Sequence, residues 1–402
     1  MLAGVSRERR LHQDEAGRRG PVRLMRNLYS ITANQAANKE QQKNLDIELF
    51  RGFAVAITVV SHFGYLIHEW FEWTGYFWLG GGVDLFFAIS GFLITRSLLD
   101  SLERNRSFVA YAKLFWIRRL FRLWPAALTW STLFLLLSIF VDFTGFERDE
   151  VFRSWLFGAL NIENLYIYAC SKSSPPCSIT PLWHYWSLSL EEQFYLLLPF
   201  ALFFTRQRKL LIWPCLAIAF CQAVSLRPWG HLLWFIRSDS LMYGTVVGIG
   251  WRYYGPTLES GFSAFPRWLL QLFLAGLSVL LIVVARDQIS QRHMGLVAVT
   301  AGLIVLILSR NSNLFTEARM SKIVATYIGS RSYSLYLVHV PILWVLREML
   351  LKFSTLQIAT NLQHQIFALA LGLAFSLILS ECSYRFIESP CRRLGRRIAS
   401  RA

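Results

Sequence analysis

Long apolar segments recur along the whole chain, and they constrain its fold more than any other feature. A bilayer core of about 30 Å needs about 20 mainly apolar residues per helix, and 54% of the 402 residues are hydrophobic. We therefore predict an all-α polytopic membrane protein with about ten transmembrane helices. The expected spans are 49–68, 80–100, 124–142, 183–204, 209–226, 234–253, 266–285, 293–309, 324–346 and 364–387.

The net charge of +16 does not indicate a nucleic-acid-binding protein, because the basic residues do not form one patch. They lie in the connections between the expected spans. With ten spans and both termini in the cytoplasm, the basic segments fall on the cytoplasmic side, as the positive-inside rule requires. These segments are the N-terminal tail, the loop 102–123, the turn 206–209, the loop 310–322 and the C-terminal tail.

A weaker apolar segment at 151–169 decides between ten and eleven spans. If it crossed the membrane, every later connection would change sides and the basic turn 206–209 would face outward. We therefore expect 142–182 to be one outer excursion, in which 151–169 is re-entrant or lies at the interface. An eleventh span is the alternative.

The expected domain boundaries follow from composition. Residues 1–44 form a basic cytoplasmic tail that we expect to be disordered, without the apolar stretch of a signal peptide, and Met25 is a possible alternative start. Residues 45–393 form the membrane domain, and residues 394–402 form a basic cytoplasmic tail. We expect no soluble domain after the last span.

The six cysteines do not have metal-ligand spacing, and we predict no metal site. Cys170 and Cys177 fall in the expected outer excursion, where an oxidising compartment would permit a disulfide. Sequence alone leaves open whether these two residues form one, because disulfide geometry is specific.

The first expected span carries an arginine and a histidine whose spacing brings them to the same face of a helix. Eleven positions separate Arg51 from His62, which at 100° per residue brings both side chains to one helix face. Their axial separation in a helix is about 16 Å. One cation and one titratable ring would therefore sit at different depths on the same face.

Other ionisable residues fall inside the expected spans. Placing a charged group in the hydrocarbon core is unfavourable in free energy, so such residues normally face a cavity or a partner. His184, Ser187 and Glu191 share one face of the span 183–204, since they occupy positions i, i+3 and i+7. The expected topology brings the polar residues of several spans to similar depths in the outer half, which predicts one shared cavity that opens outward. Its members would be His62, Asp84, His184, Ser187, Glu191, Arg237, Asp239 and His339.

The inner side has a different character, because its ionisable residues are arginines. Arg51 lies at the cytoplasmic end of the first span, and Arg118, Arg119 and Arg122 lie where the span 124–142 begins. Guanidinium groups suit phosphate and carboxylate ligands. Each residue alone also has an ordinary explanation, such as helix packing or a positive-inside anchor, so the hypothesis depends on the combination.

Seven segments together resemble the acyltransferase 3 family of integral-membrane O-acyltransferases over most of 45–393. They are "ELFRGFAVAITVVSHF", "GGVDLFFAISGFLI", "RRLFRLWP", "HYWSLSLEEQFYLLLP", "IRSDSLMYG", "SRSYSLYLVHVP" and "YRFIESPCRR". The family's arginine–histidine pair matches Arg51 and His62, and its carboxylate three residues before the arginine matches Glu48. Its R-x-x-R motif matches Arg119 and Arg122, and its tryptophan–serine–leucine–glutamate motif matches the stretch from Trp186 to Glu191. The hydrolase-like domain of some members is not expected here.

The resemblance implies a reaction, a donor and a place for it. A cytoplasmic acyl-CoA, usually acetyl-CoA, would donate an acyl group to a hydroxyl of a cell-surface glycan or glycolipid, with no permanently bound cofactor. The protein would lie in the inner membrane of a bacterium as a multi-pass protein. Its partners would be the lipid bilayer, the acyl-CoA and the acceptor, and not a nucleic acid.

These expectations give each residue a role. Arg119 and Arg122, with Arg118 beside them, would hold the phosphates of CoA, and Arg51 would guide the pantetheine arm. Neutral His62 would act as general base. Its ring would be oriented by Glu191 or Asp84, and Arg237 would stabilise the oxyanion. Trp186, Ser187, His184, Asp239 and His339 would line the acceptor site. An acyl-His62 intermediate is the alternative mechanism.

A different class of function also fits rows of intramembrane charges. A transporter or flippase for a lipid-linked sugar would need such residues along its pathway. It would not need contacts to CoA, so consumption of a thioester by the purified protein separates the two hypotheses.

Overall fold

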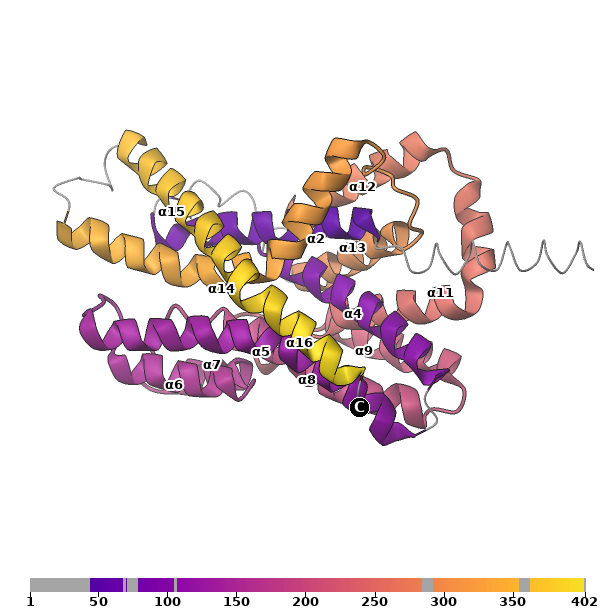
Figure 1. Ribbon diagram of the computed structural model, residues 1–402, viewed down its shortest axis with the longest axis horizontal. Coiled ribbons are helices and arrows are strands. Elements are labelled where there is room, and N and C mark those ends of the chain that lie inside the picture. Colours follow the sequence, from indigo (N-terminus) through magenta and orange to yellow (C-terminus); the bar gives the residue numbers. More distant parts are fainter. Residues whose placement is uncertain are drawn as a thin grey trace, which may run out of the picture. The chain divides into compact units, whose positions relative to one another are not determined.

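The computed structural model describes residues 44–67, 70, 79–104, 107–283, 292–353 and 362–400. Within these ranges the chain is helical and contains no strand. The residues from Leu45 onward form one compact unit, shown in Figure 1. The predicted disorder of the tail 1–44 concerns residues that, Asn44 apart, lie outside the described ranges, and it stays a prediction.

The helices follow one another with short connections. In chain order they are α2 (Leu45–Ser61), η1 (His62–Tyr65), α4 (Gly81–Leu102), α5 (Phe108–Phe140), α6 (Arg148–Ala159), α7 (Glu163–Lys172), α8 (Tyr185–Phe204), η3 (Arg208–Leu211), α9 (Ile212–Val224), α10 (Leu232–Phe235), α11 (Asp239–Ser263), α12 (Arg267–Val283), α13 (His293–Leu308), α14 (Arg319–Phe353), α15 (Leu362–Ser383), η4 (Tyr384–Glu388) and α16 (Ser389–Ala399).

The helix lengths confirm the predicted class but not the number of spans. Among the described residues, five helices are long and apolar enough to cross a membrane, and a sixth span results if α11 and α12, bent by 105°, count as one. Each of the ten expected spans contains a helix. However, α9 has 13 residues and α13 has 16, fewer than the about 20 that a span needs. The ten spans and the cytoplasmic termini therefore stay predictions.

The expected loop 102–123 is wrong over most of its length, because α5 already begins at Phe108. Its leucines, lysine and arginines are strong helix formers, and nothing before the apolar stretch breaks the helix. The 33 residues of α5 span about 50 Å, which exceeds the bilayer core. Four basic residues that were expected in a loop, Lys113, Arg118, Arg119 and Arg122, therefore stand on a rigid helix.

The segment 151–169 does not form one spanning helix, so an eleventh span of that kind is wrong. The chain forms α6, with 12 residues, and α7, with 10, separated by a turn in which Asn161 has a φ of 56°. At 1.5 Å per residue neither helix reaches about 20 Å. In Figure 1, α6 lies along α5, and the Trp155 indole donates to Thr132 Oγ1 at 3.0 Å.

A disulfide links the end of α7 to the segment that follows it. Cys170, at the end of α7, and Cys177 form a disulfide, which answers the question that the sequence left open. Cys215, Cys221, Cys382 and Cys391 are free.

Close helix contacts bring the polar residues together. At Gly244 of α11, a Cβ atom would collide with the carbonyl of Ala88 on α4. At Gly329 of α14, it would collide with Glu48 of α2. Small residues allow such approaches between membrane helices. As a result, α4 packs along α11 and α2 packs along α14, which sets the geometry described next.

Candidate active site

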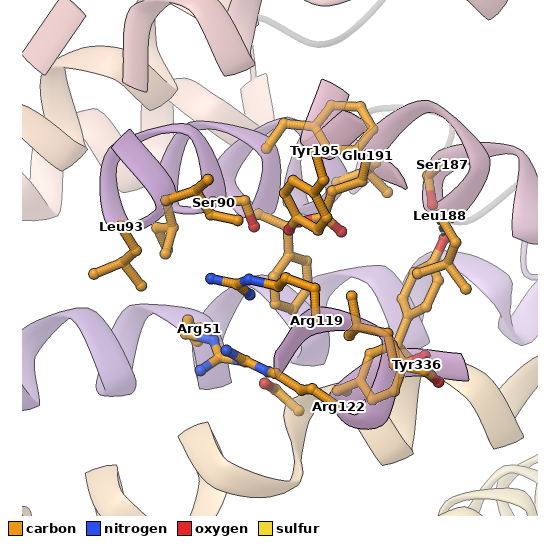
Figure 2. A pocket seen from close by; sticks show the side chains of 18 residues that line it. Arg51, Ser90, Leu93, Arg119, Arg122, Ser187, Leu188, Glu191, Tyr195 and Tyr336 are labelled. Atoms are coloured by element: carbon orange, nitrogen blue, oxygen red, sulfur yellow. Dashed lines mark hydrogen bonds between the residues drawn. The ribbon is translucent and has the colours of Figure 1, made fainter. Parts of the chain in front are cut away.

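A cavity of about 100 Å³ lies between α2, α4, α5, α8 and α14. Figure 2 shows three arginine head groups gathered on one side of it, with Ser187 and Tyr336 on the opposite side. The cavity is smaller than typical ligand sites of about 300–1,000 Å³. Its walls are Arg51, Val83, Phe86, Phe87, Ile89, Ser90, Leu93, Ile94, Arg119, Arg122, Leu123, Ser187, Leu188, Glu191, Tyr195, Ser332, Tyr333 and Tyr336.

Of the three arginines that line the cavity, Arg51 has an ion-pair partner, and Arg119 and Arg122 have none among the described residues. Arg51 donates to Glu48 at 3.3 Å. Arg119 lies over the rings of Tyr195 and Phe115, at 5.1 and 5.7 Å, and the Nε of Arg122 is buried without an acceptor. Within the described ranges, neither Arg119 nor Arg122 forms an ion pair or donates a hydrogen bond to a protein group. Guanidinium groups are suited to bind phosphate and carboxylate groups.

Arg118 does not belong to this group, contrary to the sequence prediction. Its side chain is exposed, and its Nε donates to the Leu114 carbonyl of the same helix at 2.9 Å. Arg118 precedes Arg119 by one residue, so the two side chains point about 100° apart around α5. Only Arg119 and Arg122, which are separated by three residues, share the face that borders the cavity.

The opposite side of the cavity is closed by a hydroxyl pair. Ser187 Oγ and Tyr336 Oη lie 2.5 Å apart, and Tyr336 Oη donates to the His184 carbonyl at 2.9 Å. Both side chains are buried. Between the arginines and this pair, Glu191 accepts a short hydrogen bond from Tyr195 Oη. The predicted residues Ser187 and Glu191 therefore line the cavity.

Three histidines form a cluster on the far side of Tyr336. The His62 Nδ1 and the His339 Nε2 lie 2.8 Å apart, and the His184 ring centroid is 5.6 Å from that of His339. His339 is fully buried, whereas His62 is partly exposed. His184 Nδ1 donates to the Pro181 carbonyl at 2.8 Å. The prediction that His62, His184 and His339 lie together is confirmed.

The orientation of His62 differs from the expected one. Its ring was expected to be oriented by Glu191 or Asp84, but His339 contacts it instead. His62 begins the 3₁₀ turn η1 directly after α2, and this tighter turn changes the expected alignment with Arg51 on one helix face. Arg51 lines the cavity and His62 does not.

Asp84, Arg237 and Asp239 form a separate network of buried ion pairs. Arg237 Nη2 lies 3.5 Å from Asp84 Oδ2, and Ser240 Oγ donates to Asp84 Oδ1 at 2.9 Å. Arg227 Nη2 donates to Asp239 Oδ2 at 2.7 Å. Removing one partner of a buried pair is strongly destabilising, so this network fixes α11 against α4 and the loop before α10.

Aromatic rings hold Arg237 in place. Its guanidinium carbon lies 4.7 Å from the ring centroid of Trp186 and 4.9 Å from that of Trp234. Asp84, Trp186, Arg237 and Asp239 do not line the arginine cavity. The expectation of one shared cavity is therefore wrong, because the polar residues divide into the arginine cavity, the histidine cluster and this ion-pair network. The catalytic and binding roles predicted for the individual residues stay predictions.

Sequence reasoning did not identify Tyr336, which contacts Ser187, His184 and His339. It lies three residues before His339 on one face of α14, inside the quoted segment "SRSYSLYLVHVP", so helical spacing could have found it. Arg227, the partner of Asp239, carries no such signal, because it lies in a short connection outside any motif.

The chain is similar to a known protein family over most of its length. Residues 44–381 match the acyltransferase 3 family model, described as an acyltransferase domain. The peptidoglycan O-acetyltransferase OatA of Listeria monocytogenes is 28% identical over 392 residues, covering 87% of this chain and 56% of the relative. The O-acetyltransferase OatA of Staphylococcus aureus is 28% identical over 358 residues, covering 79% and 54%.

The putative peptidoglycan O-acetyltransferase YrhL of Bacillus subtilis is 29% identical over 382 residues, covering 87% of this chain and 55% of the relative. The chain thus spans about half the length of these relatives. No solved structure matches it. Because the family match covers the larger part of the chain, including the arginine cavity and the histidine cluster, the chain belongs to the acyltransferase 3 family.

Proposed function

We propose that this protein transfers an acyl group, most simply acetyl, from a cytoplasmic acyl-CoA to a hydroxyl of a cell-surface glycan or glycolipid. The observation that carries the proposal is the adjacency of two chemically different sites. The cavity lined by Arg51, Arg119 and Arg122 lies next to the pair Ser187 and Tyr336, and this pair in turn contacts the cluster of histidines. Relatives whose names contain O-acetyltransferase support the same reaction class.

The arginine cavity is the donor side of the proposal. Arg119 and Arg122 bind phosphate oxygens of CoA through charge-assisted hydrogen bonds, for which a forked guanidinium is well suited. Arg51, held by Glu48 at 3.3 Å, lies beside the pantetheine arm. The aromatic wall formed by Tyr195, Tyr333 and Phe87 accommodates the apolar part of that arm.

The histidine cluster is the acceptor side. The acceptor hydroxyl oxygen attacks the thioester carbonyl carbon while His62 takes the hydroxyl proton as general base. The carbon–sulfur bond then breaks, and the proton passes to the CoA thiolate, which leaves as the thiol. His62 suits this role because it is the partly exposed member of the cluster, whereas His184 and His339 are buried.

The acceptor belongs to the glycans of the cell surface. Two of the relatives are named for peptidoglycan, so fragments of that polymer are the first acceptor to test. A glycolipid is the second, since an acceptor that reaches a site among membrane helices can be tethered to the bilayer.

The decisive experiment uses the full chain, purified in detergent, with acetyl-CoA and peptidoglycan fragments. We expect free CoA thiol to appear together with a product whose mass has increased by one acetyl group. Release of thiol without an acetylated product would indicate the wrong acceptor, and the assay would then be repeated with glycolipids. Absence of thioester consumption with every acceptor would overturn the proposal and favour a flippase.

A further inference from the structure

The hydrogen bonds of His339 determine which of its ring nitrogens carries the proton. Its Nδ1 lies 2.8 Å from the Tyr336 carbonyl and 3.1 Å from the Leu335 carbonyl. A carbonyl oxygen only accepts hydrogen bonds, so Nδ1 carries the hydrogen in this arrangement. In the neutral ring the second nitrogen, Nε2, is then an acceptor.

The same reasoning extends to His62. Its Nδ1 lies 2.8 Å from His339 Nε2, and two acceptors cannot form a hydrogen bond with each other. His62 Nδ1 therefore carries the hydrogen and donates it, which leaves Nε2 of His62 as the unprotonated, basic nitrogen. No described carboxylate hydrogen-bonds to the His62 ring, so this tautomer depends on His339.

We propose that His339 is a positioning residue that holds His62 in the tautomer in which Nε2 is the base. The inference rests on the proposed function, since it gives a physical reason why His62 can accept a proton from the acceptor. When His62 becomes protonated, its Nδ1–H continues to donate to the neutral His339, which stabilises the imidazolium. His339 is fully buried and its Nε2 is hydrogen-bonded to His62, so it acts through that ring and does not touch the substrate.

The neighbourhood of His339 supports a positioning role rather than a packing role. The Nδ1 of His339 is hydrogen-bonded to carbonyls of its own helix. Among the described residues, the hydrogen-bond partner of its Nε2 is His62. The ring centroids of His62 and His339 lie 5.0 Å apart at an interplanar angle of 27°, and the Tyr65 ring stacks on His62 with the centroids 5.4 Å apart. His62 is thus held by the hydrogen bond at its Nδ1 edge and by the stacked ring of Tyr65.

Two substitutions of His339 separate these roles in the transfer assay. In His339→Gln, the amide oxygen can accept from His62 Nδ1, so we expect turnover within about tenfold of the wild type. In His339→Leu, the acceptor is lost while the apolar environment is kept, so we expect kcat to fall at least about 100-fold with KM little changed, as for loss of a base. Equal losses in the two variants would overturn the inference.

A double variant tests whether His339 acts through His62. If it does, His62→Gln combined with His339→Leu should be no slower than His62→Gln alone, because residues that act as a unit are not additive. A further loss of tenfold or more in the double variant would indicate an independent role and overturn the proposal. Thermal unfolding of each purified variant separates these effects from misfolding.

A spectroscopic measurement tests the tautomer without any turnover. Nitrogen-15 NMR of histidine-labelled protein in bilayers, with His62→Gln to assign the signals, should show His62 protonated at Nδ1 and unprotonated at Nε2. In His339→Leu, the Nε2–H form should appear. A wild-type His62 protonated at Nε2 would overturn the inference even if acetyl transfer occurs, whereas absence of transfer with the expected spectrum would overturn only the proposed function.

Discussion

Replacing Arg122 with glutamine should weaken the binding of CoA while leaving the fold intact. In the structure the Nε of Arg122 is buried without an acceptor, and no described carboxylate forms an ion pair with this residue. Its removal therefore breaks no internal salt bridge. What is lost is the interaction of the guanidinium with the ligand.

The size of the effect follows from the number of bonds lost. A hydrogen bond to a charged group contributes about 1.5–3 kcal/mol, and each 1.4 kcal/mol changes Kd about tenfold. One such bond to a CoA phosphate predicts a Kd about 10- to 150-fold higher in Arg122→Gln. Binding should not disappear, because Arg51 and Arg119 remain in the cavity.

Arg118 provides a matched control for this measurement. It lies on the same helix, is exposed, and donates to the Leu114 carbonyl instead of facing the cavity. Arg118→Gln removes the same charge, so its Kd for CoA should stay within about twofold of the wild type, since exposed charges are screened. Both variants are titrated with CoA and, separately, with pantetheine, which has no phosphate.

Two results would refute the reasoning about the donor side. One is an Arg122→Gln protein that binds CoA as tightly as the wild type, which would reduce Arg122 to a topology anchor. The other is an equal loss in Arg118→Gln and Arg122→Gln, which would indicate a general effect of surface charge. A change in pantetheine affinity in Arg122→Gln would show that the arginine contacts another part of the donor.

Further predictions concern the base, the topology and a buried acid. His62→Gln should lower acyl transfer by about 10²–10⁴-fold while the protein stays monodisperse and binds CoA; more than about a tenth of wild-type turnover would contradict the base role. In a background without the six natural cysteines, Ser174→Cys should react with an impermeant outer thiol reagent and Gln207→Cys should not; the reverse would invert the topology. Burial raises the pKa of Glu163 well above 4.5 despite a hydrogen bond from Ser154. Protonated Glu163 therefore stabilises the fold fully below the pKa that this residue has in the unfolded chain, and this stabilisation is lost as the pH rises through its pKa in the folded protein. The unfolding temperature of Glu163→Gln should accordingly rise relative to that of the wild type as the pH increases above 4.5.

The sequence predicted the class of fold and the approximate position of every helix in the spans, because apolar length is a local property. It also predicted that Arg51, Arg119 and Arg122 share a site, since motif spacing fixes the face of a helix. It could not exclude Arg118, because charge alone does not tell which side of α5 faces the cavity. It placed the start of α5 too late, because arginine-rich segments resemble loops although their residues form helices well.

The sequence could not predict which residues form ion pairs with the buried charges, and the reason is a different one. Asp84 and Arg237 are brought together by the contact of α4 with α11, and Asp239 is paired with Arg227 from a short connection. A sequence shows that a charge lies in a span, but pairing depends on how helices turn toward each other. The sequence therefore predicted one polar cavity where the structure has a cavity, a histidine cluster and an ion-pair network.

The packing of α2 explains how Arg51 and His62 come to lie at two different sites. Its packing along α14 brings Arg51 to the cavity with Ser332 and Tyr333, and brings His62 to His339. Under the proposed function, a thioester held at the arginines has to pass Tyr336 before it meets His62. Tyr336 closes that route through its hydroxyl, which contacts Ser187, and its backbone carbonyl accepts the Nδ1–H of His339. Tyr336 thus lies on the route of the donor and also helps to fix the tautomer of His339, which positions the base. Under the proposed function, admission of the acyl group therefore requires the Tyr336 side chain to move while its backbone stays in place.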